Sequence, residues 1–354
     1  MTASQDEIDV ARGDLTRLVF GQMAARVLGT ALRLGVFDRF GRGADGGRSA
    51  AEVASDLGTD PRATLRLLRA MAALRLLTEG SPDHFALAPA GALLHGGGAE
   101  SPSGDSVSMA AFVRLFTGPL VLSGWDHLGD SLRSGEPSFE AAFGVDCFTF
   151  LTQNPEGAAE FNAAMSQGTS ATAAGLAGAY DFDRFKTVVD VGGGDGTLLA
   201  AILRGRPALR GMVFDTAAGV AEAGATLARE ELAERCTVHA GDFFTGVPAG
   251  GDLYLLKSVL IDWDDDRCVG ILEQCRRAVP DDGRLLIVEN ILPPTVNGST
   301  PPGAYLSDLN MLVNTGGRVR TRAELERLCT RAGFTPTGLT PLPPPFAALE
   351  AAPS

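Results

Sequence analysis

Lysine is almost absent from this sequence, and positive charge as a whole is scarce. Only Lys186 and Lys257 occur among 30 basic residues, and 43 acidic residues bring the formal net charge to −13. Such an excess of negative charge repels the phosphates of nucleic acids and the headgroups of anionic lipids. We therefore expect neither nucleic acid nor a membrane as a partner.

Long apolar segments are missing as well. No apolar run approaches the roughly 20 residues that a membrane-spanning helix needs. The first residues, MTASQDEIDVARGD, carry early acids and no apolar core of a secretion signal. We therefore expect a cytoplasmic protein.

The chain also lacks the cysteine and histidine spacings of metal sites. Its five cysteines form no C-x-x-C pair, and its four histidines form no H-x-x-x-H or H-x-H pair. We expect no metal and no disulfide. Cys268 and Cys275 lie two helical turns apart, which favours buried thiols on the core-facing stripe of one helix.

The length of 354 residues, 45% of them hydrophobic, predicts two domains with sizeable cores. Residues 14–40 have apolar residues at helical spacing, and Ser49 with Glu52 forms a capping box for the next helix. Asp60-Pro61 starts another helix, and HFALAPAGALL predicts a short wing strand and a further helix. This order of elements is typical of a winged helix. Its arginines are compatible with DNA binding, but the acids interleaved with them favour a structural module.

A Gly/Ser-rich stretch at 96–108 predicts the domain boundary, so we assign the first domain to 1–105 and the second to 106–354. Helices are expected over 109–180. From residue 186 onward, buried strands alternate with helices, which predicts an α/β fold with a doubly wound, Rossmann-like parallel sheet.

A glycine-rich loop follows the first strand of this sheet. The segment DVGGGDG places Asp190 two residues before Gly192, with Gly194 and Gly196 at alternate positions. Glycines at these positions allow a tight turn and a close approach of the backbone to a ligand. The spacing D-x-G-x-G-x-G differs from the G-x-G-x-x-G of nicotinamide enzymes.

Two further acids are expected at the same edge of the sheet. Asp215 ends the second strand, where a carboxylate accepts hydrogen bonds from ribose hydroxyls, and Asp242 follows the third strand beside Phe243. Asp242 could accept from an adenine amine while Phe243 stacks on the ring. Each acid alone fits a loop cap, but three acids at three successive strand ends predict a nucleoside-containing ligand.

These features and several longer motifs resemble the S-adenosylmethionine (SAM)-dependent small-molecule O-methyltransferases of plant phenolic and actinobacterial polyketide metabolism. The matching segments include LKSVLIDWDDDRC, LGVFD, WDHL, FNAAM, GDFF, LLIVEN and DLNMLVNTGG. The resemblance implies a class I methyltransferase domain, an N-terminal winged-helix dimerisation domain, and a homodimer. It implies SAM as cofactor, S-adenosylhomocysteine as its product, Lys257 as a cofactor contact, and a small-molecule substrate held beneath the helices of 109–180.

The sequence departs from this family where the family places its general base. The family pattern K-x-x-x-H-D-W-D-D has a catalytic His where this chain has Ile261. Two glutamates orient that His in the family; one matches Glu289, and the other falls at Val319 in GGRVRT. Two of the three catalytic positions are therefore branched aliphatics.

Three explanations for the missing base remain open at this point. Alignment of the acceptor with the methyl group can itself supply much of the rate, with Asp262 as a hydrogen-bonding residue, and we favour this explanation. Asp262 can act as the base if burial raises its pKa well above the ordinary value of about 3.9. The protein can also be a SAM-binding hydroxylase or pericyclase; a metabolite-sensing winged-helix regulator is a more distant alternative.

The remaining candidates are pocket residues for the small molecule. Met165 and Met311 match family positions that sandwich a flat substrate, although core packing is the commoner role of a single Met. The expected substrate-binding residues are Trp125, Phe161, Met165, Asp262, Asp308, Asn310, Met311 and Asn314.

Overall fold

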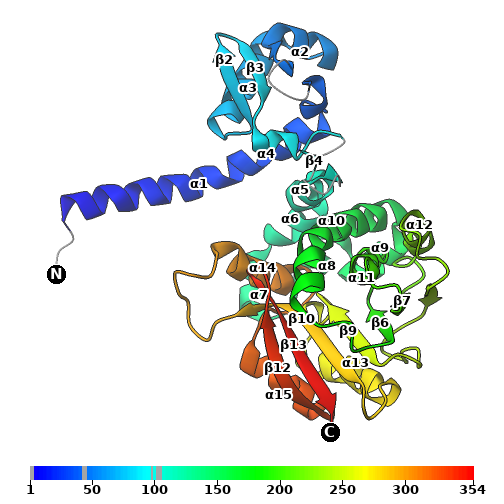
Figure 1. Cartoon of the computed structure of the whole chain (residues 1–354). Coiled ribbons are helices and arrows are strands. Elements are labelled where there is room, and N and C mark those ends of the chain that lie inside the picture. Colours follow the sequence, from blue (N-terminus) through cyan, green and yellow to red (C-terminus); the bar gives the residue numbers. More distant parts are fainter. Residues whose placement is uncertain (1–3, 42–45, 97–98, 101–105) are drawn as a thin grey trace. The chain divides into compact units, whose positions relative to one another are not determined.

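The chain forms two compact units, Met1–Pro119 and Leu120–Ser354 (Figure 1). The computed structural model describes residues 4–41, 46–96, 99–100 and 106–354. The predicted boundary after residue 105 falls on the segment 101–105, which lies outside the described residues.

The first unit consists of helices with a small antiparallel sheet. Its helices are α1 (Gln5–Arg33), α2 (Ala50–Leu57), α3 (Pro61–Ala73), α4 (Pro89–Ala92) and α5 (Ala110–Thr117), with a 3-10 turn at Phe37–Arg39. Its strands are β1 (Arg48–Ser49), β2 (Leu77–Ser81), β3 (His84–Leu87), β4 (Ala99–Glu100) and β5 (Ser106–Val107).

Local capping explains where these helices begin and end. The Ser49 side chain accepts from the Glu52 backbone N–H, and the Glu52 carboxylate accepts from Ser49, so the predicted capping box is confirmed. Gly58 ends α2 in the left-handed conformation, and Asp60 caps α3 with Pro61 at its first position. The β2–β3 hairpin and α4 confirm the predicted wing.

The second unit contains an eight-stranded sheet with helices around it. The sheet order is β12-β13-β10-β9-β6-β7-β8, and the short strand β11 pairs with β10. Its strands are β6 (Thr187–Val191), β7 (Arg210–Asp215), β8 (Cys236–Ala240), β9 (Leu253–Lys257), β10 (Arg284–Leu292), β11 (Arg320–Thr321), β12 (Phe334–Pro341) and β13 (Phe346–Pro353).

Ten helices of four residues or more accompany this sheet in the described part of the second unit. They are α6 (Pro119–Trp125), α7 (Leu128–Ser134), α8 (Phe139–Phe143), α9 (Cys147–Gln153), α10 (Pro155–Ala179), α11 (Thr197–Leu203), α12 (Ala223–Arg229), α13 (Asp265–Ala278), α14 (Pro302–Asn314) and α15 (Arg322–Arg331). A 3-10 helix, η3, spans Leu260–Asp262.

Both faces of the central strands are buried, as helices on both sides of a parallel sheet require. Val188 belongs to one hydrophobic cluster and its neighbour Val189 to the other, because successive side chains point to opposite faces of a strand. Leu255 and Leu256 of β9 divide in the same way. Strands β6, β7, β8, β9 and β10 run parallel, which confirms the predicted doubly wound sheet.

The cysteines are thiols in this structure. Cys268 and Cys275 are fully buried on α13, which confirms the predicted core-facing stripe. All five cysteines are free. Among the described residues, no cluster of three or more His, Cys, Asp or Glu side chains is arranged to hold a metal ion. None of the helices over these same residues combines the length and hydropathy needed to cross a bilayer.

Candidate active site

The glycine loop links β6 to α11 with three residues in left-handed conformations. Gly192, Gly194 and Gly196 have φ values of 73°, 54° and 78°, which side chains disfavour. A Cβ on Gly192 would overlap Val259, whereas the space beside Gly194 is open. The loop is therefore packed tightly at its base and accessible at its tip, as a ligand-cradling turn requires.

The loop and the predicted acids surround one cavity of about 310 Å³. All seven residues predicted to bind the cofactor line this cavity: Asp190, Gly192, Gly194, Asp215, Asp242, Phe243 and Lys257. They converge because β6, β7, β8 and β9 are parallel and their carboxyl ends meet at one edge of the sheet.

Asp215 accepts a hydrogen bond from the tip of the loop and still has free acceptor sites for a ligand. Its Oδ2 accepts from the Gly194 N–H at 3.0 Å, and its Oδ1 accepts from the Thr216 N–H at 2.6 Å. A carboxylate has about four acceptor sites, so ribose hydroxyls could still bind there. Burial raises the pKa of Asp215, against the opposing effect of these two backbone donors.

Asp190 contributes a buried acceptor to the same wall. It is 1% exposed, and its Oδ2 has no hydrogen-bond partner among the described residues. Burial, followed by the negative charge of Asp215, raises the pKa of Asp190 to about 7, while Lys257 opposes the shift. An orphaned buried oxygen at a cavity wall indicates a missing polar partner, such as a ligand donor.

Helix α10 closes the cavity with a stripe of polar side chains that sequence reasoning missed. Asn162 donates to the carbonyl of Ala218 after β7, at 3.3 Å. Ser166 donates to Asp195 in the glycine loop at 2.7 Å, and Thr169 accepts from Lys257 Nζ at 3.1 Å. Spacings of four and three residues place this stripe on one helix face, so α10 is bonded to three strand-end segments.

Lys257 is surrounded by carboxyl groups at the deep end of the cavity. Burial lowers its pKa, and the negative charges of Glu289, Asp190 and Asp262 oppose that shift. Burial raises the pKa of Asp262 to about 7 and that of Glu289 to about 8. Asp262 also lines the cavity, so a carboxyl group whose pKa is raised by burial borders the space for a ligand.

Aromatic side chains form much of the remaining wall. Phe161 and Met165, both predicted substrate contacts, line the cavity on α10. Trp263 and Phe148 also line it and stack on each other, with ring centroids 4.7 Å apart at 20°. The sequence analysis did not single out these two, although Trp263 follows directly after the predicted Asp262.

The other predicted substrate residues do not line this cavity. Trp125 donates from Nε1 to the side-chain oxygen of Asn310 at 2.9 Å, and the Asn314 amide donates to that same oxygen at 2.9 Å. Asp308 accepts from the Val319 N–H at 2.8 Å, and Met311 lies on the same helix, α14. Trp125, Asn310 and Asn314 therefore form a hydrogen-bonded group between α6 and α14, whereas Asp308 and Met311 share only the helix α14 with it.

Ile261, one of the two positions where the family pattern breaks, contacts the glutamate that still matches it. The Ile261 N–H donates to Glu289 Oε1 at 3.3 Å, so Glu289 still contacts the turn where a His would stand. Glu289 is 3% exposed, and its second oxygen is unpartnered among the described residues. Val319 is buried at 5%. The imidazole and one carboxylate of the family arrangement are thus replaced by apolar packing.

A doubly wound sheet with this glycine loop and these strand-end acids defines a SAM-dependent methyltransferase. The chain belongs to the O-methyltransferase family: the O-methyltransferase domain matches residues 125–335, and the O-methyltransferase dimerisation domain matches residues 16–97. The resemblance identified from the sequence and the predicted fold class are both confirmed.

Named relatives agree over nearly the full length. O-demethylpuromycin-O-methyltransferase of Streptomyces alboniger is 45% identical over 97% of this chain and 89% of its own length. The crystal structure of mitomycin 7-O-methyltransferase MmcR has a TM-score of 0.87 at 32% identity, covering 99% of this chain and 100% of that one. Human N-acetylserotonin methyltransferase in complex with SAM has a TM-score of 0.87 at 27% identity, with 100% of both chains covered.

The residues of the cavity fit SAM, the predicted cofactor. The acceptor capacity of Asp215 suits ribose hydroxyls, and Asp242 with Phe243 suits the adenine. The unpartnered oxygen of Asp190 suits a donor of the amino-acid end. The negative side chains around the cavity complement the positive sulfur of SAM.

We predict that Asp215→Ala weakens SAM binding by about 10–150-fold, because it removes charged acceptors of the ribose worth about 1.5–3 kcal/mol. Isothermal titration calorimetry measures the dissociation constant directly. Asp282→Ala, at an exposed turn remote from the cavity, is the control and should bind SAM like the unaltered protein. Equal affinity in the Asp215 variant would remove this residue from the cofactor site.

Proposed function

We propose that this protein O-methylates an aromatic small molecule and that Asp262 accepts the proton of the acceptor hydroxyl. The observation that carries the proposal is the position of Asp262, whose carboxyl group lines the cavity beside Lys257, Trp263 and the cofactor loop. Asp262 is adjacent to the family position of the general base, so a carboxylate is available where the imidazole is missing.

The proton-transfer step follows from this placement. When bound, SAM supplies a methyl group on a positively charged sulfur, which keeps the bonding electron pair as S-adenosylhomocysteine leaves. Asp262 takes the proton of the acceptor hydroxyl as the oxygen forms its bond to the methyl group. The wall of Phe161, Met165 and Trp263 orients a flat ring and excludes water.

The protonation behaviour of Asp262 supports the base role over the purely hydrogen-bonding role favoured from sequence. A free Asp with a pKa of about 3.9 is a weak base. Burial raises the pKa of Asp262 to about 7, and Lys257 limits the rise. A carboxyl group that titrates near 7 matches the operating range of a general base.

A label-transfer experiment tests the proposed reaction. The protein is incubated with methyl-labelled SAM and a panel of hydroxylated aromatics that includes O-demethylpuromycin, because the relative named for it is 45% identical. We expect label in an aryl O-methyl group, identified by mass spectrometry and NMR. Label on nitrogen or carbon, or no label in any product, would contradict the proposed reaction.

We also propose that the protein is a homodimer assembled through its N-terminal unit. Helix α1 exposes large apolar side chains over several turns; Val10, Leu15, Leu18 and Phe20 are 57–72% exposed. A row of apolar side chains of this size favours burial in an interface. The match to a dimerisation domain over residues 16–97 supports this assembly.

Light scattering coupled to size exclusion should report twice the mass of one chain. We predict that Leu18→Glu/Phe20→Glu yields a folded monomer, because two charges at the interface cannot be desolvated. Val296→Glu is the matched control, since Val296 is an 80% exposed apolar residue of the second unit. A dimer that survives the α1 substitutions would place the interface elsewhere.

The absence of a nucleic-acid partner stays a prediction from the acidic sequence, and the cytoplasmic location stays a prediction from the lack of long apolar segments. Arg69 on the α3 helix pairs with Glu79 and Asp83, which supports a structural role for the wing. A gel-shift assay with genomic fragments should give no retarded band.

A further inference from the structure

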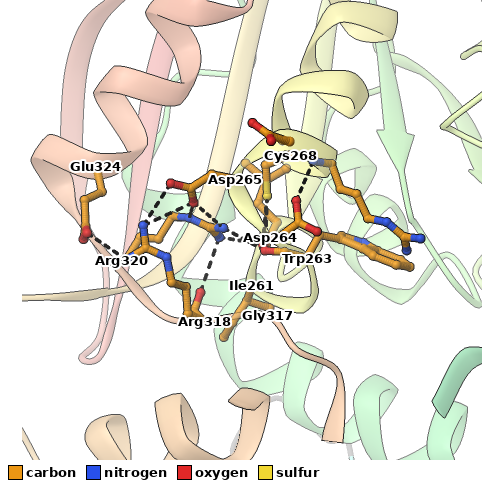
Figure 2. A network of polar contacts seen from close by, with 12 residues as sticks. Ile261, Trp263, Asp264, Asp265, Cys268, Gly317, Arg318, Arg320 and Glu324 are labelled. Atoms are coloured by element: carbon orange, nitrogen blue, oxygen red, sulfur yellow. Dashed lines mark hydrogen bonds and ion pairs between the residues drawn. The ribbon is translucent and has the colours of Figure 1, made fainter. Parts of the chain in front are cut away.

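A buried arginine, Arg320, donates hydrogen bonds to the turn that carries Asp262. Arg320 itself does not line the cavity. The side chain of Arg320 is 1% exposed. It donates to the carbonyl of Leu260 at 2.7 Å and to the carbonyl of Trp263 at 2.7 Å. Figure 2 shows this guanidinium among the residues of the turn and the N-terminal part of α13.

The two carbonyls held by Arg320 flank Asp262 in the chain. They belong to η3 and to the residue after it, so one rigid guanidinium fixes the backbone on both sides of the carboxyl group. Cys268 adds a thiol donor to Leu260 O at 3.2 Å. The planar guanidinium group of Arg320 presents several N–H donors in fixed directions and therefore binds both carbonyl oxygens at once. The single ammonium group of a lysine cannot reproduce this geometry.

The turn is also confined from other directions. Gly317 packs so closely that an added Cβ would overlap the backbone of Ile261 and Asp262. Glu289 accepts from the Ile261 N–H on another side. The backbone around Asp262 therefore has little freedom to shift, although the side chains at 261 and 319 are apolar.

The charge of Arg320 is balanced without using Asp262. Asp265 Oδ1 accepts from its Nε at 3.0 Å and from its terminal nitrogen at 2.9 Å. Arg318 shares Asp265 and pairs with Glu324 at 2.8 Å, but it makes no contact with the carbonyls of Leu260 or Trp263 in the described structure. Arg318 is therefore a matched control for loss of an arginine in this network.

We propose that Arg320 is a positioning residue that keeps Asp262 directed at the acceptor hydroxyl, an inference that rests on the proposed function. Arg320 orients the turn through its backbone carbonyls, which does not depend on the side chains at positions 261 and 319. A displacement of about 1 Å at a reacting group can slow a reaction by about 100-fold. Arg320 does not line the cavity, so it acts on the chemical step through Asp262.

The test compares single-turnover methyl transfer in Arg320→Lys and Arg318→Ala, each in the unaltered and the Asp262→Asn background. We expect Arg320→Lys to slow transfer by about 10–100-fold, with the SAM dissociation constant changed less than threefold. In the Asp262→Asn background the same change should cost less than twofold. Arg318→Ala should cost less than twofold in both backgrounds.

A second variant displaces the turn through a different neighbour, Gly317. Gly317→Ala should also slow transfer in the unaltered background and spare SAM affinity, so the inference stays testable if Arg320→Lys folds poorly. If Arg320→Lys slows transfer equally in the unaltered and the Asp262→Asn backgrounds, or weakens SAM binding in parallel, Arg320 is not a positioning residue for Asp262. Either result would leave the proposed methyl transfer standing. No methyl transfer by the unaltered protein to any acceptor would overturn the proposed function and the positioning role of Arg320 with it.

Discussion

Asp262→Asn is expected to slow single-turnover methyl transfer by about 100-fold at pH 8, because a well-placed general base contributes roughly 10²–10⁴-fold. Asparagine has nearly the same shape and still hydrogen-bonds, but it does not accept a proton under these conditions. Rapid-quench measurements with labelled SAM give the rate of the chemical step without product release.

Two controls separate the base role from pocket shape. Ile261→Ala removes apolar volume beside the same turn, so it should change the acceptor KM more than the single-turnover rate. SAM affinity of the Asn variant should stay within about threefold of the unaltered protein. If Asp262→Asn retains most of its rate, alignment alone drives the reaction, and Asp262 serves only as a hydrogen-bonding residue.

Lys257→Met is expected to lower the melting temperature by roughly 6–20 °C at pH 8.5. Removing one partner from a buried charge cluster costs about 3–5 kcal/mol, and each kcal/mol shifts a domain of this size by about 2–4 °C. The positive charge of Lys257 opposes the negative charges of Asp190 and Glu289, which are buried, and of Asp262, which is half-buried. Calorimetry across pH measures the effect.

The pH dependence of this effect has a definite sign. The folded pKa values of about 7 for Asp190 and Asp262 and about 8 for Glu289 lie above the ordinary values. Their neutral forms therefore favour the fold fully only below the ordinary carboxyl pKa of about 4, and this stability is lost as pH rises from there through the folded values of about 7 to 8. The additional loss of stability caused by Lys257→Met should appear as the carboxyl groups ionise near pH 7 to 8, and it should be small at pH 5.5, where they are still largely neutral in the folded protein.

Lys186→Met is the matched control, because Lys186 is the second lysine of the chain and its side chain is exposed. We expect no change in melting temperature for this variant at either pH. A Lys257→Met protein as stable as the unaltered one at pH 8.5 would show that the lysine does not neutralise the cluster.

Local signals in the sequence were sufficient for the parallel strands of the sheet and for the loop and acids that line its cavity. The glycine loop and the strand-end acids were predicted because parallel strands bring their carboxyl ends together at one edge. Capping residues such as Ser49 and Asp60 fixed helix starts that the structure confirms. Each of these signals depends on residues within a few positions of one another.

The C-terminal hairpin β12–β13 escaped prediction because its sequence carries prolines. Pro336 and Pro341 lie within β12, and proline normally argues against a strand. Strand β12 is at the edge of the sheet, where a missing N–H leaves no ladder bond unmade. Edge position is a property of the assembled sheet and cannot be read from the segment itself.

The residues that line the cavity outside the glycine loop and the strand ends were harder to predict for a related reason. Trp125, Asn310 and Asn314 bond to one another across two helices, whereas Trp263 and Phe148 line the cavity. The raised pKa of Asp262 and the hydrogen bonds from Arg320 to the turn beside it both depend on segments far away in the chain. Periodicity and motif spacing carry no information on such long-range burial.

The pH dependence of single-turnover methyl transfer tests the base role of Asp262 most directly. With the acceptor identified by label transfer, the rate should rise with pH through an apparent pKa at or below about 7, since burial raises the Asp262 value and the positive sulfur of SAM lowers it. The account predicts that this inflexion disappears in Asp262→Asn. The same inflexion in both proteins would contradict Asp262 as the proton acceptor.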